Sequence, residues 1–217
     1  IGTDKDYKKR AQNMRTIQEL QAIQQQLVAA VKSQNLQNAL QIINDTGVTL
    51  RTSVCGFTAS TYLGQEADGR FRAWCQAHAE LNFNFNFTCY VHGVGMSGNR
   101  EYARQLRTQL DADVDLIAQG AAHGGHRDYA EELRTQFGAD VSSIAAGAAR
   151  GGHRAYAEIL RTQHNANVSW IAIGAAQGGH RAYAEQLRTQ FDVDVITIAY
   201  SAAQGGHRDY CEMLRTQ

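Results

Sequence analysis

A 27-residue repeat is the feature that most constrains how this chain can fold. The stretch Gly124–Val141, GGHRDYAEELRTQFGADV, recurs along the chain, and the tetrapeptide LRTQ occurs five times. A fixed period between about 20 and 50 residues is typical of stacked repeats, in which each unit buries its apolar side against its neighbours. We therefore expect an elongated solenoid. The period is read from the repeated histidines His126, His153, His180 and His207.

Each repeat is predicted to form two helices joined by a glycine turn. Asp113 precedes a Val-x-x-Ile pattern, and Asp or Asn at such a position caps a helix by accepting from its first free backbone N–H groups. The pair Gly124-Gly125 then supplies the turn, because glycine tolerates the left-handed conformation in which helices end. A second helix runs from the histidine through LRTQ. The caps of the later copies are Asp140, Asn167 and Asp194.

Apolar residues fall on one side of each predicted helix. In the second helix, Tyr129 and Leu133 recur in every regular copy and form the packing stripe, with Phe137 or Phe191 expected to seal its end. The alanines of the first helix allow close approach of a neighbouring helix. The predicted core residues of the first helix are Val114, Ile117, Ala118, Ala121 and Ala122.

Charged residues recur on the second helix at helical spacing. Arg127, Glu131 and Arg134 stand at i, i+4 and i+7, and the pattern repeats in the next two copies. Such pairs contribute only about 0.2–0.5 kcal/mol each to an isolated helix. We interpret this ridge as a solvated outer face, with a docking ridge for an acidic partner as the alternative.

One stripe of the first helix varies between copies while the framework stays constant. It comprises the third, sixth and tenth residues after the cap, and a changing surface on a constant framework is expected of a binding scaffold. Trp170, Ile173 and Tyr200 would form an aromatic–aliphatic cluster suited to an interface hot spot. The alternative is that they pack against the second helix or an adjacent repeat. The predicted partner-binding residues are Leu116, Gln119, His123, Arg150, Trp170, Ile173, Gln177, Thr197, Tyr200 and Gln204.

The N-terminal part is less regular, so we divide the chain into an irregular helical region, 1–92, and regular repeats, 93–217. A helix is predicted over 4–32, with an apolar stripe at helical spacing, and another over 36–44. We expect further helices over 48–65 and 71–81. The alternating NFNFNF of 82–87 is either a strand or an irregular junction whose phenylalanines cap the array. The predicted stripe of the first helix is Ile17, Leu20, Ile23 and Leu27.

Composition supports an all-α protein. The 217-residue chain has no proline, and 21 basic side chains balance 21 acidic ones. A neutral chain lacks the basic footprint of most nucleic-acid binders. No apolar run approaches the ~20 residues that span a bilayer. No signal peptide is visible and the chain opens at Ile1, which favours a processed fragment and a cytoplasmic protein.

Four cysteines lack metal-type spacing, and we expect reduced thiols, with Cys211 as a small buried one. At the C-terminal end, Tyr210 and Leu214 would be partly bare. We therefore expect the natural chain to continue, or this end to self-associate with another copy.

The repeat resembles the ankyrin repeat. Ala121-Ala122, Gly125-His126 and Gly138–Val141 match the AA-x-x-G-H and G-A-D-V parts of that motif. The T-P-L-H start is missing, and the period is shorter than that of ankyrin by about the residues that build its β-hairpin. The resemblance is clear over 93–217 and weak over 26–92. It implies a right-handed α-solenoid of roughly seven helical hairpins without projecting β-hairpins.

The resemblance also implies protein–protein binding through a concave surface rather than catalysis. Polar, Asn/Gln-rich arrays of this kind are similar to those of effector proteins from intracellular bacteria, which implies a location in the host cytosol. We therefore expect a non-enzymatic scaffold that binds a partner protein. Two alternatives stay open: an enzyme whose active part lies around Cys55–His92, and a modular RNA-binding solenoid that reads one base per repeat.

No cofactor or metal site is expected. Stacked helices lie ~8–10 Å apart, whereas zinc ligands converge at ~2.0–2.1 Å, so histidines one repeat apart form a ladder and cannot share an ion. We expect them to cap the second helix and pack beside the glycine turn. Asp111–Asp115 lacks the glycine and the closing glutamate of a calcium loop. Cys89 and His92 suggest a nucleophile and base, but no orienting acid is evident.

Overall fold

The computed structural model describes residues 17–54, 57–78, 81 and 85–216. This part of the chain contains 14 helices and no strand, with one isolated β-bridge between Val54 and Phe57. The helices pair in chain order into seven hairpins and pack on their sequence neighbours. The prediction of an all-α solenoid is therefore confirmed.

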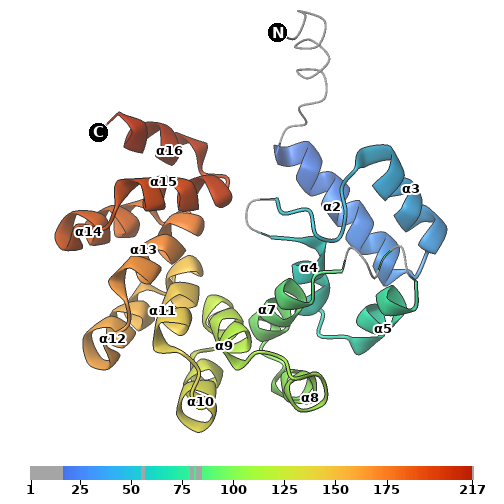
Figure 1. Cartoon of the computed structure of the whole chain (residues 1–217), viewed down its shortest axis with the longest axis horizontal. Coiled ribbons are helices and arrows are strands. Elements are labelled where there is room, and N and C mark those ends of the chain that lie inside the picture. The colour runs from blue at the N-terminus through green and yellow to red at the C-terminus, as the bar shows by residue number, and fades with distance from the viewer. Residues whose placement is uncertain (1–16, 55–56, 79–80, 82–84, 217) are drawn as a thin grey trace, which may run out of the picture.

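Two layers follow the course of the array (Figure 1). The inner helices stack on one another, and each outer helix from α8 onward packs on its own inner helix, whereas α5 contacts α2. The inner helices are α4 (Ala59–Gln65), α7 (Phe87–Ser97), α9 (Val114–His123), α11 (Val141–Arg150), α13 (Val168–Gln177) and α15 (Val195–Gln204). The outer helices are α5 (Gly69–Ala77), α8 (Arg100–Leu110), α10 (Arg127–Phe137), α12 (Arg154–His164), α14 (Arg181–Phe191) and α16 (Arg208–Arg215). The first hairpin is α2 (Ile17–Lys32) and α3 (Leu36–Thr46).

The helix boundaries of the regular repeats follow the predicted caps. The carboxylate of Asp140 accepts from the backbone N–H of Ser143 at 2.7 Å, and the side chains of Asp113, Asn167 and Asp194 cap their helices in the same way. The predicted core is also confirmed, because Ile117, Ala118, Ala121 and Ala122 are buried, as are their counterparts in α11 and α13. In α15, Ile198 and Ala202 are buried, whereas Ala199 is half-buried and Ala203 is exposed. Val114 is half-buried against that core.

Glycine brings the inner helices into backbone contact. A Cβ built at Gly147 would overlap the carbonyl oxygen of Gln119 on α9, and one at Gly174 would overlap that of Ala146 on α11. These glycines fall in the middle of their helices, where glycine is otherwise unfavourable by about 1 kcal/mol relative to alanine. At the last junction the same register holds Ser201, and α15 packs less closely on α13.

The charged ridge on the outer helices joins neighbouring repeats, so its interpretation as a solvated face is wrong in part. Glu131 pairs with Arg134 of its own helix at 2.7 Å and accepts from the Tyr156 hydroxyl of the next repeat at 2.9 Å. Arg127 does not pair along its helix; its guanidinium lies 5.0 Å from the ring centre of Tyr156. The same bonds recur one and two repeats later through Glu158 and Glu185. The ridge therefore helps to hold the register of the stack.

The repeated histidines also connect repeats. His153 occupies the N-cap position of α12, as expected, but its side chain makes no capping bond. Its Nε2 lies 3.2 Å from the carbonyl oxygen of His123, the last residue of α9, which is the inner helix of the preceding repeat. The imidazole ring of His153 also covers Gly125. His126, His180 and His207 make the same contact with Met96, Arg150 and Gln177. The predicted packing beside the glycine turn is confirmed, whereas the predicted capping bond is not found.

The N-terminal region departs from the prediction at three points. The expected helix over 48–65 begins only at Ala59, because Thr49 and Thr52 bond to local backbone groups and Thr58 caps the later start. In α2 the buried face is shifted, since Gln24 is buried and donates to the carbonyls of Thr52 and Phe57. Ile17, at the start of the predicted stripe, is exposed. The predicted segment 4–16 lies outside the described residues.

The described end of NFNFNF is a junction rather than a strand. Phe85 is buried, with its ring centre 5.2 Å from that of Tyr90, and Asn86 caps α7. Residues 82–84 lie outside the described part. The prediction that Phe137 and Phe191 seal the outer helices is wrong, because both rings are exposed and each is covered by an arginine of the preceding outer helix, Arg107 or Arg161.

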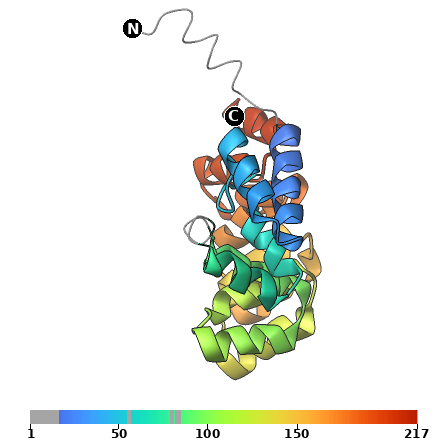
Figure 2. The same cartoon turned by 90° about the vertical axis from the view of Figure 1, so that its right-hand side faces the viewer.

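Seen from the side in Figure 1, the array bends into an arc that brings its ends to face each other. The N-terminal arm, α2 to α5 with the described residues 48–54 and 57–58 between α3 and α4, stands opposite α13 to α16. In the perpendicular view, α2 lies at the same height as the C-terminal helices (Figure 2). Residues of both arms line one pocket, so the arc encloses a shared space.

Candidate binding surface on the inner helices

The variable stripe of the inner helices is divided among three environments. The tenth residues after the cap, Arg150, Gln177 and Gln204, line the pocket between the arms. Among the sixth residues, the Gln119 side chain contacts Gly147 of the next repeat, whereas Tyr200 is exposed. Among the third residues, Leu116 packs against the core, Thr197 bonds to its cap Asp194, and Trp170 is 46% exposed.

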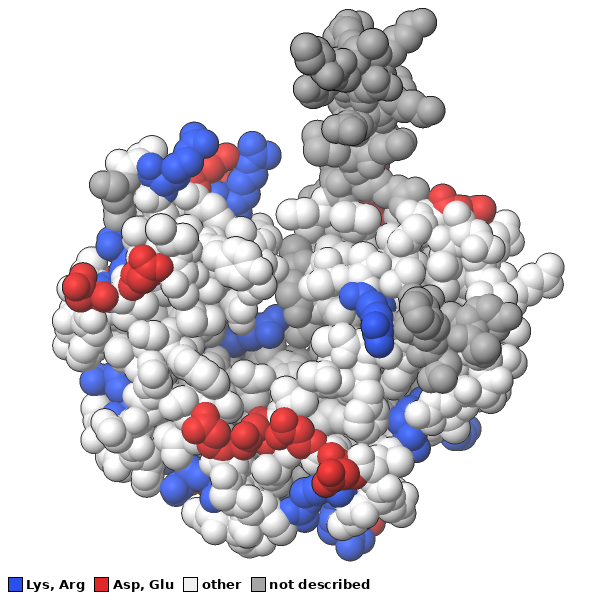
Figure 3. Space-filling view, in the orientation of Figure 1, with Lys and Arg blue, Asp and Glu red and all other residues white. Residues whose placement is uncertain are grey.

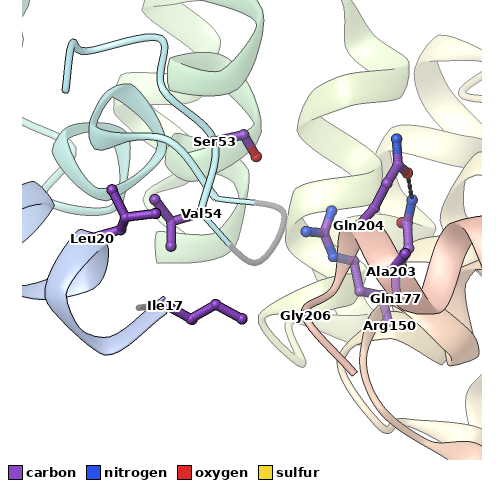
Figure 4. Close-up of a pocket in the computed structure, with 9 residues that line it drawn as sticks. All are labelled: Ile17, Leu20, Ser53, Val54, Arg150, Gln177, Ala203, Gln204 and Gly206. Carbon is purple, nitrogen blue, oxygen red and sulfur yellow. Dashed lines mark hydrogen bonds between the residues drawn. The ribbon is translucent and has the colours of Figure 1, made fainter. Parts of the chain in front are cut away.

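The pocket between the arms, called the hollow from here on, has a volume of about 510 Å³. This lies within the roughly 300–1,000 Å³ range of common ligand sites. In Figure 4, Ile17, Leu20 and Val54 form one wall, and Arg150, Gln177 and Gln204 face them from the inner helices. The described lining residues are Ile17, Leu20, Ser53, Val54, Arg150, Gln177, Ala203, Gln204 and Gly206.

Arg150 gives the hollow its positive charge. Its guanidinium lies 4.8 Å from the ring centre of Phe57, a cation–π contact that ties α11 to the N-terminal arm. Burial lowers the pKa of Arg150 from its usual value, and the nearby Cys89 opposes that shift. In the space-filling view, basic side chains appear in the depth between the arms, whereas acidic side chains form a band across the lower part of the same face (Figure 3).

Gln177 and Gln204 form a hydrogen-bonded pair one repeat apart. The Nε2 of Gln177 donates to the Oε1 of Gln204 at 2.9 Å. Each carboxamide has a second polar atom, so the pair offers one acceptor, on Gln177, and one donor, on Gln204. Both atoms are carried by residues that line the hollow.

The last inner helix carries exposed apolar side chains where earlier helices bind the next repeat. Two residues after the cap, Asp115 accepts from the backbone N–H of Asp140 at 2.7 Å, and Ser142 accepts from that of Asn167 at 3.0 Å. The equivalent residue of α15 is Ile196, which cannot accept and is 75% exposed. With Tyr200, which is 65% exposed, it makes up what we call the end face.

A buried cluster lies beneath the hollow, where α7 and α9 meet Phe57. The rings of His92 and His123 have centres 5.5 Å apart, and Phe57 lies 5.6 Å from His123. Burial, and then the charge of Arg150, lowers the pKa of His92 to about 3. Burial, then His92 and Arg150, likewise lowers the pKa of His123 to about 3. Among the described residues, His92 Nε2 and His123 Nδ1 find no hydrogen-bond partner.

This geometry gives little support to a catalytic Cys89–His92 pair. The two residues are three apart on α7, yet no hydrogen bond between their side chains is found among the described residues, and a histidine with so low a pKa is a weak base at neutral pH. In the part of the chain that is described, no three His, Cys, Asp or Glu side chains are placed to hold a metal ion. Cys75, Cys89 and Cys211 are free thiols; Cys75 is buried, but Cys211 is only half-buried.

A scan against models of known families found no match, and a search of curated proteins found no relative. The fold itself defines the class: this is an all-α helical-repeat protein. Within the described helices, none is long and apolar enough to cross a bilayer.

Three residues that line the hollow, Arg150, Gln177 and Gln204, were predicted from the sequence, whereas the residues of the opposite wall were not. Ile17, Leu20, Ser53 and Val54 come from the irregular arm, where no repeat register predicts which side chains face inward. Ile196 could have been found, because it interrupts the register Asp115, Ser142 and Ser169.

Proposed function

We propose that this protein is a non-enzymatic scaffold that binds a partner protein on the surface of its inner helices. One observation carries the proposal: large apolar and hydrogen-bonding side chains remain available on a face that stacking does not use. Trp170, at a variable position, is 46% exposed, whereas constant positions such as Gly147 and His153 contact the neighbouring repeat. The helical-repeat fold suits this role, because stacked repeats present extended binding surfaces. A role as a secreted effector stays a prediction from the resemblance.

Replacing Trp170 with alanine tests this proposal. Because the indole is nearly half exposed, we expect little loss of stability and a large loss of binding, about tenfold or more, as is typical of an aromatic hot spot. The measurement is capture of partner proteins by immobilised wild-type and variant chains, with the melting temperature of each recorded alongside.

Phe191→Ala provides the matched control, since this exposed aromatic lies on the outer helix α14. Binding that survives Trp170→Ala but is lost with Phe191→Ala would place recognition on the outer layer. A Trp170→Ala chain that unfolds would show that the indole is part of the core.

We also propose self-association through the end face, favoured by the exposed Ile196 and Tyr200. If two copies meet there, Ile196→Lys should shift sedimentation from a concentration-dependent dimer to a monomer, because a lysine charge is costly to bury in an apolar contact. Ile17→Lys, on the other arm, is the control. A wild-type chain that sediments as a monomer at every concentration would refute the proposal.

A further inference from the structure

We propose that the hollow binds an extended peptide segment that is acidic and apolar in alternation, with a carboxylate at Arg150 and the backbone N–H and C=O of one residue at the Gln177–Gln204 pair. The inference rests on the proposed function, and it adds the chemistry of the partner and the place where it binds. Its argument comes from charge, hydrogen-bonding capacity and spacing.

The charge of the hollow selects an anionic group. Among its described lining residues, Arg150 is the one that is charged, and the others are neutral. Its guanidinium is held against Phe57, so its position is fixed before a ligand arrives. A guanidinium presents N–H donors in a planar fork that matches a carboxylate, and low local polarity strengthens such a bond.

The glutamine pair favours the polypeptide backbone of a ligand over its side chains. Because Gln177 and Gln204 already share one hydrogen bond, the atoms left over are one acceptor and one donor on adjacent repeats. In an extended chain the N–H and C=O of one residue point to the same side, so the backbone of one residue can donate to the free oxygen of Gln177 and accept from the amide of Gln204. An apolar side chain could use neither atom, and a second carboxylate would leave the acceptor facing an anion.

The spacing of the repeats suits an extended chain. Inner helices in contact lie ~8–10 Å apart, and an extended chain advances ~3.3 Å per residue, so about three residues span one repeat. Successive side chains of an extended segment point to opposite sides. A carboxylate directed at Arg150 would therefore be followed by a side chain directed at the opposite wall, which is made of Ile17, Leu20 and Val54. That wall favours an apolar residue there.

The test uses the full chain and three pools of labelled, end-blocked peptides of about eight residues, a length that spans the hollow. Leucine or valine occupies alternate positions, the central position between them is Glu, Gln or Lys, and the rest are uncharged polar residues. Binding is measured by fluorescence anisotropy. We expect the Glu pool to bind about tenfold tighter than the Lys pool, as one charge-assisted contact provides.

Variants of the hollow separate the two contacts. Arg150→Glu should reverse the preference, so that the Lys pool binds tighter. The double variant Gln177→Leu/Gln204→Leu should weaken the Glu pool about tenfold while its preference over the Lys pool persists. Arg104→Gln, an exposed arginine paired with Glu101 on the outer helix α8, is the control and should change neither. If Arg150→Glu fails to fold by circular dichroism, Arg150→Gln replaces it and should abolish the preference.

Equal binding of the Glu and Lys pools by the wild-type chain would overturn the inference, as would a folded Arg150→Glu chain that still prefers Glu. These outcomes are independent of the Trp170→Ala experiment. A partner lost with Trp170→Ala, together with no preference among the pools, would retain the scaffold and reject this mode of recognition. If the partner still binds the Trp170→Ala chain and the wild-type chain prefers the Glu pool, the hollow is retained as the peptide site and the partner binds away from Trp170.

Discussion

Gly147→Ala is expected to destabilise the array strongly, although helix propensity alone predicts the opposite. Gly147 lies inside α11, where alanine would be favoured by about 1 kcal/mol. The added Cβ, however, would overlap the carbonyl oxygen of Gln119, which belongs to the backbone of α9 and cannot swing away. Overpacking of this kind costs about 1–3 kcal/mol, so the net effect should be a loss of stability. Urea denaturation measures it directly.

Ser201→Ala is the matched control for Gly147→Ala. Ser201 occupies the same register at the last junction between inner helices, where a Cβ is already accommodated. Its hydroxyl bonds to the Thr197 carbonyl of its own helix, so its removal should change stability by less than about 1 kcal/mol. If Gly147→Ala instead raised the urea midpoint, the inner helices would not be in backbone contact.

Acid should destabilise the protein through His92 and His123. Their pKa values are about 3 in the folded protein against a usual 6.5. Above pH 6.5 both histidines are neutral in the folded and in the unfolded protein, so they do not change the free energy of unfolding. Below pH 6.5 the two histidines gain protons in the unfolded chain but stay neutral in the folded one. The free energy of unfolding therefore falls until the folded protein also protonates near pH 3. The slope is about 1.4 kcal/mol per pH unit for each histidine, or about 4 kcal/mol for both by roughly pH 5.

Denaturation curves at several pH values test this expectation. His92→Gln and His123→Gln should each remove about half of the acid sensitivity, whatever they do to stability at neutral pH. An unaltered slope in the double variant His92→Gln/His123→Gln would show that other groups cause the loss of stability in acid.

The regular repeats could be predicted from sequence because their signals are local. Asp140 caps the helix that immediately follows it, and Ile144 and Leu160 are buried because helical periodicity places them on the packing side. Repetition averages out the ambiguity of any single copy, so four similar copies define one unit. The same reasoning placed Arg150, Gln177 and Gln204 on a shared stripe, and they do line one pocket.

The features that were missed depend on contacts between distant segments. The helix over 48–65 was predicted too long, since its first part is held by Gln24 of α2 and by local threonine bonds. The histidine contacts join residues 30 apart, and a single repeat cannot show them. The facing of Ile17 and Gln204 across the hollow depends on how the whole arc bends, which is set by the sum of many small rotations between repeats.

The residues that hold neighbouring repeats together differ from those on the surface proposed to bind a partner. Glycine contacts, histidine contacts and the Tyr–Glu bonds repeat with little change, and they fix each unit to the next. The residues free to vary are those that face the hollow, the end face or the solvent beside them. On the proposed function, substitutions at Gln177 or Trp170 would therefore change what is bound with little effect on the stack, whereas substitutions at Arg150 would also remove its contact with Phe57.

The most direct test of the proposed binding face is amide hydrogen exchange, measured on the free protein and on the protein bound to a captured partner. Binding on the inner surface predicts added protection in α11, α13 and α15 and in the facing residues around Ile17 and Val54, with little change in the outer helices α12 and α14. Protection confined to α12 and α14 would contradict it.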